Sequence, residues 1–109
     1  MIEAMLKTVA RYEEFLKRVN ESNENNAEYT WYRVNAEQGG CPLCRAADNY
    51  CGNCPWTKYT KGTCTTAVGT TSFMSARNAI SDSNKELINH YIGARIAELR
   101  EWIKLEERT

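Results

Sequence analysis

The chain has 109 residues, of which 42% are hydrophobic, and its 14 basic and 14 acidic side chains give zero formal net charge. This length fits a single domain, 1–109, with a small core. The charge balance disfavours nucleic-acid binding, which usually needs a basic excess. The N-terminal stretch has charges scattered through it rather than the apolar core of a signal peptide, and no segment is apolar enough to span a bilayer. We therefore expect a cytoplasmic protein that binds neither nucleic acid nor membrane.

The first twenty residues have the periodicity of an amphipathic helix. Apolar side chains recur every three or four positions, which places them on one stripe, and oppositely charged pairs four residues apart occupy the other side. The stripe consists of Ile2, Met5, Leu6, Val9, Tyr12, Leu16 and Val19. We predict a helix from about residue 2 to 21, which ends in the asparagine-rich polar run that follows.

The next segments are less regular. Residues 29–34 (YTWYRV) are aromatic and β-branched, so they could form a short strand. Two glycines, Gly39 and Gly40, then turn the chain into a segment from 41 to 72 that is rich in Cys, Gly and Thr and lacks clean periodicity. A bound inorganic centre would have to fix the shape of such a segment.

A second long helix closes the chain. Ser83 and Glu86 have the spacing of a capping box, in which both side chains satisfy unpaired amides at a helix start. We therefore predict a helix over about 84–107, and a shorter one around Phe73 to Ile80 before it. The apolar face of the long helix consists of Leu87, Ile88, Tyr91, Ile92, Ile96, Leu99, Trp102 and Ile103.

Together these elements predict a mainly α fold. The two long amphipathic helices each need an apolar partner, and the nearest partner is the other helix. We expect them to pack together, with the irregular Cys-rich metal-binding segment inserted between them in sequence, and a short β element could accompany them. Apolar area left over on the last helix could bind a protein partner or support a homodimer.

All five cysteines fall in one part of the chain, with the spacing C-x2-C-x6-C-x2-C-x9-C. A two-residue gap lets both sulfurs of a C-x-x-C pair face one metal atom. Four thiolates satisfy a tetrahedral Zn²⁺ or the four irons of a [4Fe–4S] cluster equally well. The preferred ligands are Cys41, Cys44, Cys51 and Cys54, and Cys64 is a contender for any one of these four places.

The spacing bears on which centre is held. Zinc ribbons usually separate their two pairs by roughly 15–20 residues, whereas six residues separate them here. This density, with Pro55 directly after Cys54, is closer to the loops of bacterial ferredoxins. We favour a [4Fe–4S] cluster with a structural, redox or sensing role. A structural zinc module with four cysteine ligands, which presents a helical surface to a protein partner, stays open as the alternative.

Two further interpretations involve sulfur chemistry without metal. Disulfides would leave one of five thiols unpaired, and no secretion signal indicates an oxidising compartment. A thiol–disulfide active site at either C-x-x-C pair would be expected next to a βαβ pattern, and none is visible. We therefore assign no catalytic residue, and thiol redox chemistry remains a second alternative.

The whole cysteine block also resembles a known group of proteins. Its C-x-x-C…C-x-x-C-P…C pattern, carried by Cys41, Cys44, Cys51, Cys54, Pro55 and Cys64, is similar to that of small phage- and prophage-encoded proteins of unassigned function, in which the pattern lies between helices. The resemblance covers under a quarter of the chain. It implies a viral accessory protein, present in the host cytoplasm, with a metal centre held by cysteines, and it implies no reaction.

Overall fold

The computed structural model describes residues 1–22, 26–39, 41–47, 54–59 and 73–108. These residues form six helices, and no strand occurs among them. The helices are α1 (Ile2–Glu21), α2 (Ala27–Gln38), α3 (Pro42–Ala46), α4 (Pro55–Tyr59), α5 (Phe73–Ser81) and α6 (Lys85–Glu107). The mainly α fold is confirmed, and α1, α5 and α6 begin and end within a residue or so of the predicted bounds.

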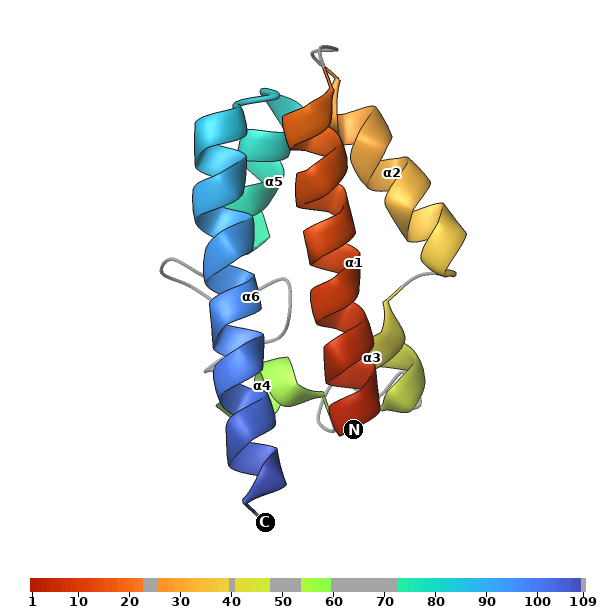
Figure 1. The fold of residues 1–109 in the computed structure, drawn as a ribbon, viewed down its shortest axis with the longest axis vertical. Helices are drawn as coiled ribbons and strands as arrows, with labels where there is room; N and C mark the ends of the chain where they lie inside the picture. Colours follow the sequence, from red (N-terminus) through yellow and green to blue (C-terminus); the bar gives the residue numbers. More distant parts are fainter. Residues whose placement is uncertain (23–25, 40, 48–53, 60–72, 109) are drawn as a thin grey trace.

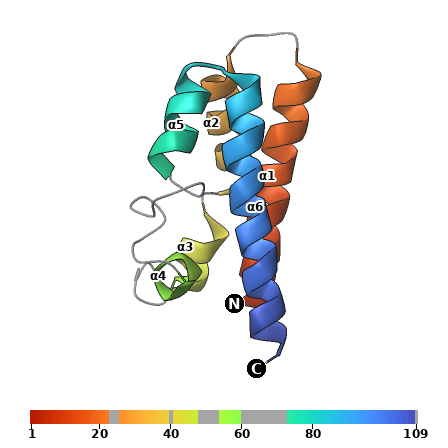
Figure 2. The same cartoon turned by 90° about the vertical axis from the view of Figure 1, so that its left-hand side faces the viewer.

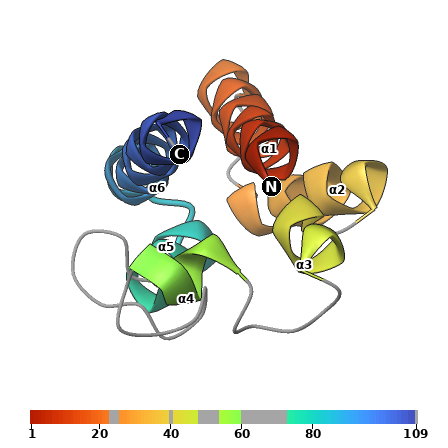
Figure 3. The same ribbon diagram turned by 90° about the horizontal axis from the view of Figure 1, so that it is seen from below.

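The helices lie in two layers. The long helices α1 and α6 run antiparallel and side by side, so both chain ends lie at the same end of the molecule (Figure 1). The shorter helices cover one side of this pair, with α2 and α5 at one end and α3 and α4 at the other (Figures 2 and 3). The most extensive contact between helices joins α1 to α6, as the two amphipathic stripes predict.

The buried face of α1 is wider than the predicted stripe, because α1 contacts α2 and α3 as well as α6. Phe15 and Thr8 are completely buried although neither belongs to the stripe. Leu6, which does belong to it, is 52% exposed, so its assignment to the core is wrong. A helix packed on two sides buries more than the single seam that sequence periodicity identifies.

Residues 29–34 form the middle of α2, so the predicted strand is wrong. Asn26 caps this helix by accepting a hydrogen bond from the Tyr29 amide at 3.1 Å. Ala27, Trp31 and Val34 then fall on one helical face, where Ala27 and Val34 are buried and Trp31 packs against the core. Packing of this face overrides the local β propensity of the aromatic and β-branched residues.

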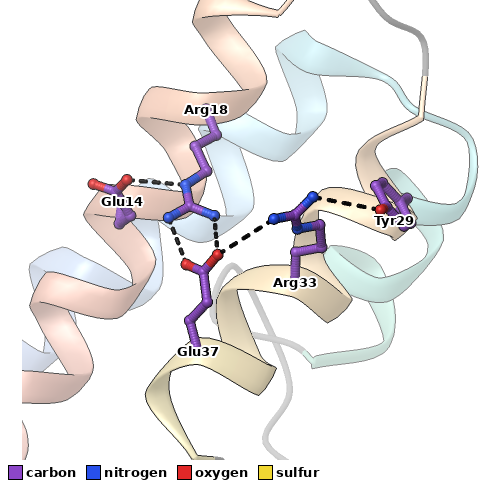
Figure 4. Close-up of polar contacts among 5 residues, drawn as sticks. All are labelled: Glu14, Arg18, Tyr29, Arg33 and Glu37. Atoms are coloured by element: carbon purple, nitrogen blue, oxygen red, sulfur yellow. Dashed lines mark hydrogen bonds and ion pairs between the residues drawn. The ribbon is translucent and has the colours of Figure 1, made fainter.

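A surface network joins α1 to α2 (Figure 4). Arg18 of α1 donates to both carboxylate oxygens of Glu37 in α2, at 2.6 and 3.2 Å, and to Glu14 on its own helix at 2.9 Å. Arg33 extends the network, lying 3.9 Å from Glu37 and contacting the Tyr29 ring. The hydrogen bonds from Arg18 hold the pKa of Glu37 below its usual value.

The turn between α5 and α6 differs from the predicted capping box. The N-cap of α6 is Asn84, whose side chain accepts from the Leu87 amide at 3.1 Å. Ser83 has a left-handed φ of 51°, and its hydroxyl accepts from the Ala27 amide at 3.0 Å instead. Ser83 therefore satisfies an unpaired donor at the start of α2 and links two turns that are far apart in sequence.

Candidate functional site

The first cysteine pair lies at the start of α3. Cys41 is the N-cap of this helix, and Pro42 follows in its first turn, where the fixed φ of proline suits a helix start. Gly39, in the left-handed conformation with φ 69°, ends α2 just before it. Arg45 donates a 2.6 Å hydrogen bond from Nη1 back to the Gly39 carbonyl. These contacts position Cys41 at the start of α3.

The core holds α3 in place. Leu43 is completely buried and Ala47 is 3% exposed, both within the main hydrophobic cluster. Cys41 is half-buried and packs against the same cluster. The helix contacts α1, so the first cysteine of the motif is fixed relative to the long helices.

The last cysteine of the second pair directly precedes α4. The Cys54 carbonyl accepts hydrogen bonds from the amides of Thr57 at 3.0 Å and Lys58 at 3.1 Å. Cys54, Pro55 and Trp56 are all buried. The Trp56 ring meets Trp102 of α6 edge-on, with centroids 4.8 Å apart. Cys54 therefore begins the turn that leads into α4, and the Trp56 side chain of that helix packs against α6.

A charged cluster adds to this anchor. Glu106 of α6 accepts hydrogen bonds from Lys58 Nζ and from the Tyr59 hydroxyl, both at 2.7 Å, and the Tyr59 ring stacks on Trp102 at 5.2 Å. The hydrogen bonds from Lys58, and then from Tyr59, lower the pKa of Glu106. The hydrogen bond to Glu106 raises the pKa of Tyr59, because its phenol proton is held by the carboxylate.

The short helices that follow Cys41 and Cys54 lie in the same region of the molecule. Both α3 and α4 are at the end where the chain begins and finishes, on the same side of the α1–α6 pair (Figures 1 and 2). The side chains of Cys41 and Cys54 are described; Cys44 lies in α3 with only its backbone described; Cys51 and Cys64 are outside the described residues. Within the described part, no three His, Cys, Asp or Glu side chains gather as metal ligands. The ligand set therefore stays a prediction.

The long helix α6 carries a buried cation that its apolar periodicity does not predict. Arg95 is 2% exposed and lies on the apolar face of α6, between Ile92 and Leu99. Its guanidinium carbon lies 4.2 Å from the centroid of the Trp56 ring, and Nη1 donates to the Tyr12 hydroxyl at 3.3 Å. A positive residue in register with an apolar face was the signal that could have identified it.

A second buried arginine lies between α1 and α2. Arg11 is 5% exposed and donates from Nη1 to Asn35 at 2.9 Å. Its guanidinium lies over the rings of Tyr12 and Trp31, at 5.0 and 5.6 Å. Within the described structure its Nε atom is buried and has no hydrogen-bond partner. This cation–π arrangement fixes the position of the Trp31 ring.

A pocket of about 370 Å³ opens where α1, α2, α5 and α6 meet. Buried or half-buried side chains form its deep wall, and exposed ones form its rim. The deep wall consists of Tyr12, Trp31, Ala76, Ile80, Ile92 and Arg95, and the rim consists of Glu28, Tyr32, Arg77 and Ser81. The volume is within the roughly 300–1,000 Å³ of small-molecule sites.

Comparisons with protein-family models, with curated proteins and with solved structures find no match for this chain. Among the described residues, no helix combines the length and the apolar character needed to cross a membrane. Function must therefore be inferred from the cysteine segment and the pocket themselves.

Proposed function

We propose that this protein is a metal-binding accessory protein that holds one [4Fe–4S] cluster through clustered cysteines. The spacing of the two C-x-x-C pairs, only six residues apart and followed by Pro55, carries the proposal. Cys41, Cys44, Cys51 and Cys54 are the proposed ligands, with Cys64 able to replace one of them. The cluster has a structural, redox or sensing role, and we assign it no catalysis.

The surroundings of Cys41 and Cys54 support this proposal. Both residues pack on the hydrophobic core, and each is followed by a proline and a short helix. Aromatic rings follow Cys54 closely: Trp56 is 1% exposed and Tyr59 is half-buried. Limited solvent access and hydrogen bonds to the sulfurs are the means by which proteins tune and protect iron–sulfur clusters.

Anaerobic purification followed by elemental analysis tests the identity of the centre. We expect brown protein with a broad absorption band at the violet end of the visible spectrum. It should contain four iron ions and four sulfide ions per chain, the stoichiometry of one [4Fe–4S] cluster. Colourless protein with one zinc ion per chain would contradict the proposed cluster and support the zinc alternative. Intact mass after rapid thiol alkylation completes the test. Two intramolecular disulfides would contradict both the iron–sulfur and the zinc proposal, and would favour thiol redox chemistry.

Single Cys→Ser substitutions test the ligand set. Loss of any of the four proposed ligands should abolish or strongly reduce the bound metal, because serine is a poor ligand for soft metals. Ala46→Ser, an exposed substitution in α3, is the matched control and should leave the metal content unchanged. If Cys64→Ser removes the centre while Cys41→Ser retains it, Cys64 replaces Cys41 in the ligand set.

A further inference from the structure

The rim of the pocket between α1, α2, α5 and α6 consists of exposed side chains from two helices. Glu28 and Tyr32 lie one turn apart on α2, and Arg77 and Ser81 lie one turn apart on α5. Residues four apart lie on the same helical face. Each of the two helices therefore brings one charged group and one hydroxyl to the mouth of the pocket. Figure 1 shows α2 and α5 together at the end of the molecule away from α3 and α4.

The two rim charges have opposite signs but do not pair with each other. Within the described part of the chain, the side chains of Glu28 and Arg77 take part in no hydrogen bond and no ion pair. The carboxylate of Glu28 can therefore accept hydrogen bonds from a ligand, and the guanidinium of Arg77 can donate them. A free anion and a free cation thus border one apolar opening, each on its own helix.

The buried cations at the deep wall already have partners within the protein. Arg95 lies 4.2 Å from the Trp56 ring and donates to the Tyr12 hydroxyl. Arg11, outside the pocket lining, lies over the rings of Tyr12 and Trp31. Their positive charge disfavours a cationic group at depth, and a carboxylate would have to displace contacts that they already make. The deep wall therefore suits an uncharged, apolar group.

We propose that this pocket binds a free amino acid with a large apolar side chain. The side chain packs against Tyr12 and Trp31 in the deep wall, the ammonium group pairs with Glu28, and the carboxylate pairs with Arg77. Such a ligand carries one charge of each sign, as the rim does. The volume of about 370 Å³ is in the range of small-molecule sites. The proposal is independent of the metal centre, because the residues that carry it belong to the four-helix junction.

Three ligands with the same phenyl group test the proposal, each titrated into the full chain and followed by the NMR chemical shifts of backbone amides. L-phenylalanine carries both charges, N-acetyl-L-phenylalanine carries only the carboxylate, and L-phenylalaninamide carries only the ammonium group. We expect L-phenylalanine to bind at least about threefold more tightly than either derivative, the effect of one further ion pair at an exposed rim. The largest shifts should occur in α2 and α5.

Substitutions of the two rim charges separate the two halves of the recognition without changing the core. Glu28→Gln should weaken binding of L-phenylalanine and L-phenylalaninamide by about threefold and leave N-acetyl-L-phenylalanine unaffected. Arg77→Gln should weaken binding of L-phenylalanine and N-acetyl-L-phenylalanine and leave L-phenylalaninamide unaffected. Glu101→Gln and Arg100→Gln change exposed charges of α6 outside the pocket lining, so as matched controls they should alter the binding of none of the three.

The proposal is overturned if L-phenylalanine gives no saturable shift of the amides around the pocket, or if either derivative binds as tightly as L-phenylalanine does. It is also overturned if a rim variant leaves all three affinities unchanged. Equal weakening of all three ligands by a rim variant would overturn it as well, because that result indicates altered packing rather than recognition of charge.

Discussion

Two glycines of this chain occupy positions with opposite requirements. Gly39 has φ 69°, and a Cβ added there would come within 2.9 Å of the Arg45 guanidinium. Gly93 lies inside α6 with helical geometry, and a Cβ added there would meet no atom within 4 Å. Of these two, Gly39 alone needs the conformational freedom of glycine, and it is the one that borders the cysteine segment.

We expect Gly39→Ala to destabilise the protein by about 1–2 kcal/mol, since alanine is strained in a left-handed conformation. Gly93→Ala, its matched control, should stabilise the protein by up to about 1 kcal/mol through helix propensity. Denaturant unfolding monitored by circular dichroism measures both changes. A Gly39→Ala variant as stable as the native protein would contradict the described turn before Cys41.

Glu106 has the pKa shift with the clearest consequence for stability. Its folded-state pKa is below the ordinary 4.5, first because of the hydrogen bond from Lys58 and then because of that from Tyr59. The stabilisation is therefore complete above pH 4.5 and is lost as pH falls through the lower folded-state pKa. Glu106→Gln should reduce the stability of the folded protein at neutral pH. It should also make that stability depend less on pH in the acidic range.

Denaturant midpoints measured from neutral to acidic pH check this expectation. Glu101→Gln changes an exposed acid on the same helix and serves as the control, which should retain the native pH profile. Equal acid sensitivity of the native protein and Glu106→Gln would show that the contact between α4 and α6 does not contribute to the profile.

At the scale of elements, the N-cap of α6 differs between the sequence-based prediction and the structure. The predicted capping box relies on Ser83 and Glu86, whereas the structure caps α6 with Asn84. Asn84→Ala should therefore cost about 1 kcal/mol, the usual value of an N-cap hydrogen bond. Glu86→Ala should have little effect, because Glu86 is exposed. Thermal unfolding of both variants decides between the two caps.

Ser83 stabilises the start of α2 rather than the start of α6. Its hydroxyl accepts from the Ala27 amide, while its own backbone is in the left-handed region. Ser83→Ala should lose the hydrogen bond and keep the strain, whereas Ser83→Gly should lose the bond and relieve the strain. Glycine should therefore be the less destabilising of the two substitutions when their unfolding midpoints are compared. The reverse order would contradict the described backbone of this turn.

Sequence periodicity predicted the long helices because their apolar faces repeat over many turns. The short segment 29–34 was misassigned because six residues carry too little periodic signal to outweigh their β propensity. Its helical identity depends on Trp31 packing beside Tyr12 and Phe15 of α1, a contact between residues distant in sequence. Local pattern alone does not contain that information.

For the whole molecule, we expect metal removal to loosen the end that contains α3 and α4 more than the end that contains α2 and α5. Helices as short as α3 and α4, with five residues each, are not stable alone in water. Chelation should therefore reduce amide protection across residues 41–72, while the long helices α1 and α6 persist. Hydrogen exchange of metal-loaded and metal-free protein measures the difference. Unchanged protection of α3 and α4 after chelation would show that the core alone holds them.

The two candidate sites differ in how far sequence could predict them. The cysteine spacing is local, so the order of residues along the chain is enough to suggest a metal centre. The pocket is assembled from four helices, and its buried charge, Arg95, comes from a residue that composition alone would place at the surface. A site made by packing becomes visible only when the packing is known.

The positions of the three tryptophans have a practical consequence. Trp31 belongs to the junction of α1 and α2, whereas Trp56 and Trp102 touch each other beside Cys54. Intrinsic fluorescence therefore arises from Trp31 at one junction and from the Trp56–Trp102 pair at another. A chain that retains only Trp31 would report events at the four-helix junction, and one that retains only Trp56 would report the proposed iron–sulfur cluster, if it is bound, by quenching of its fluorescence.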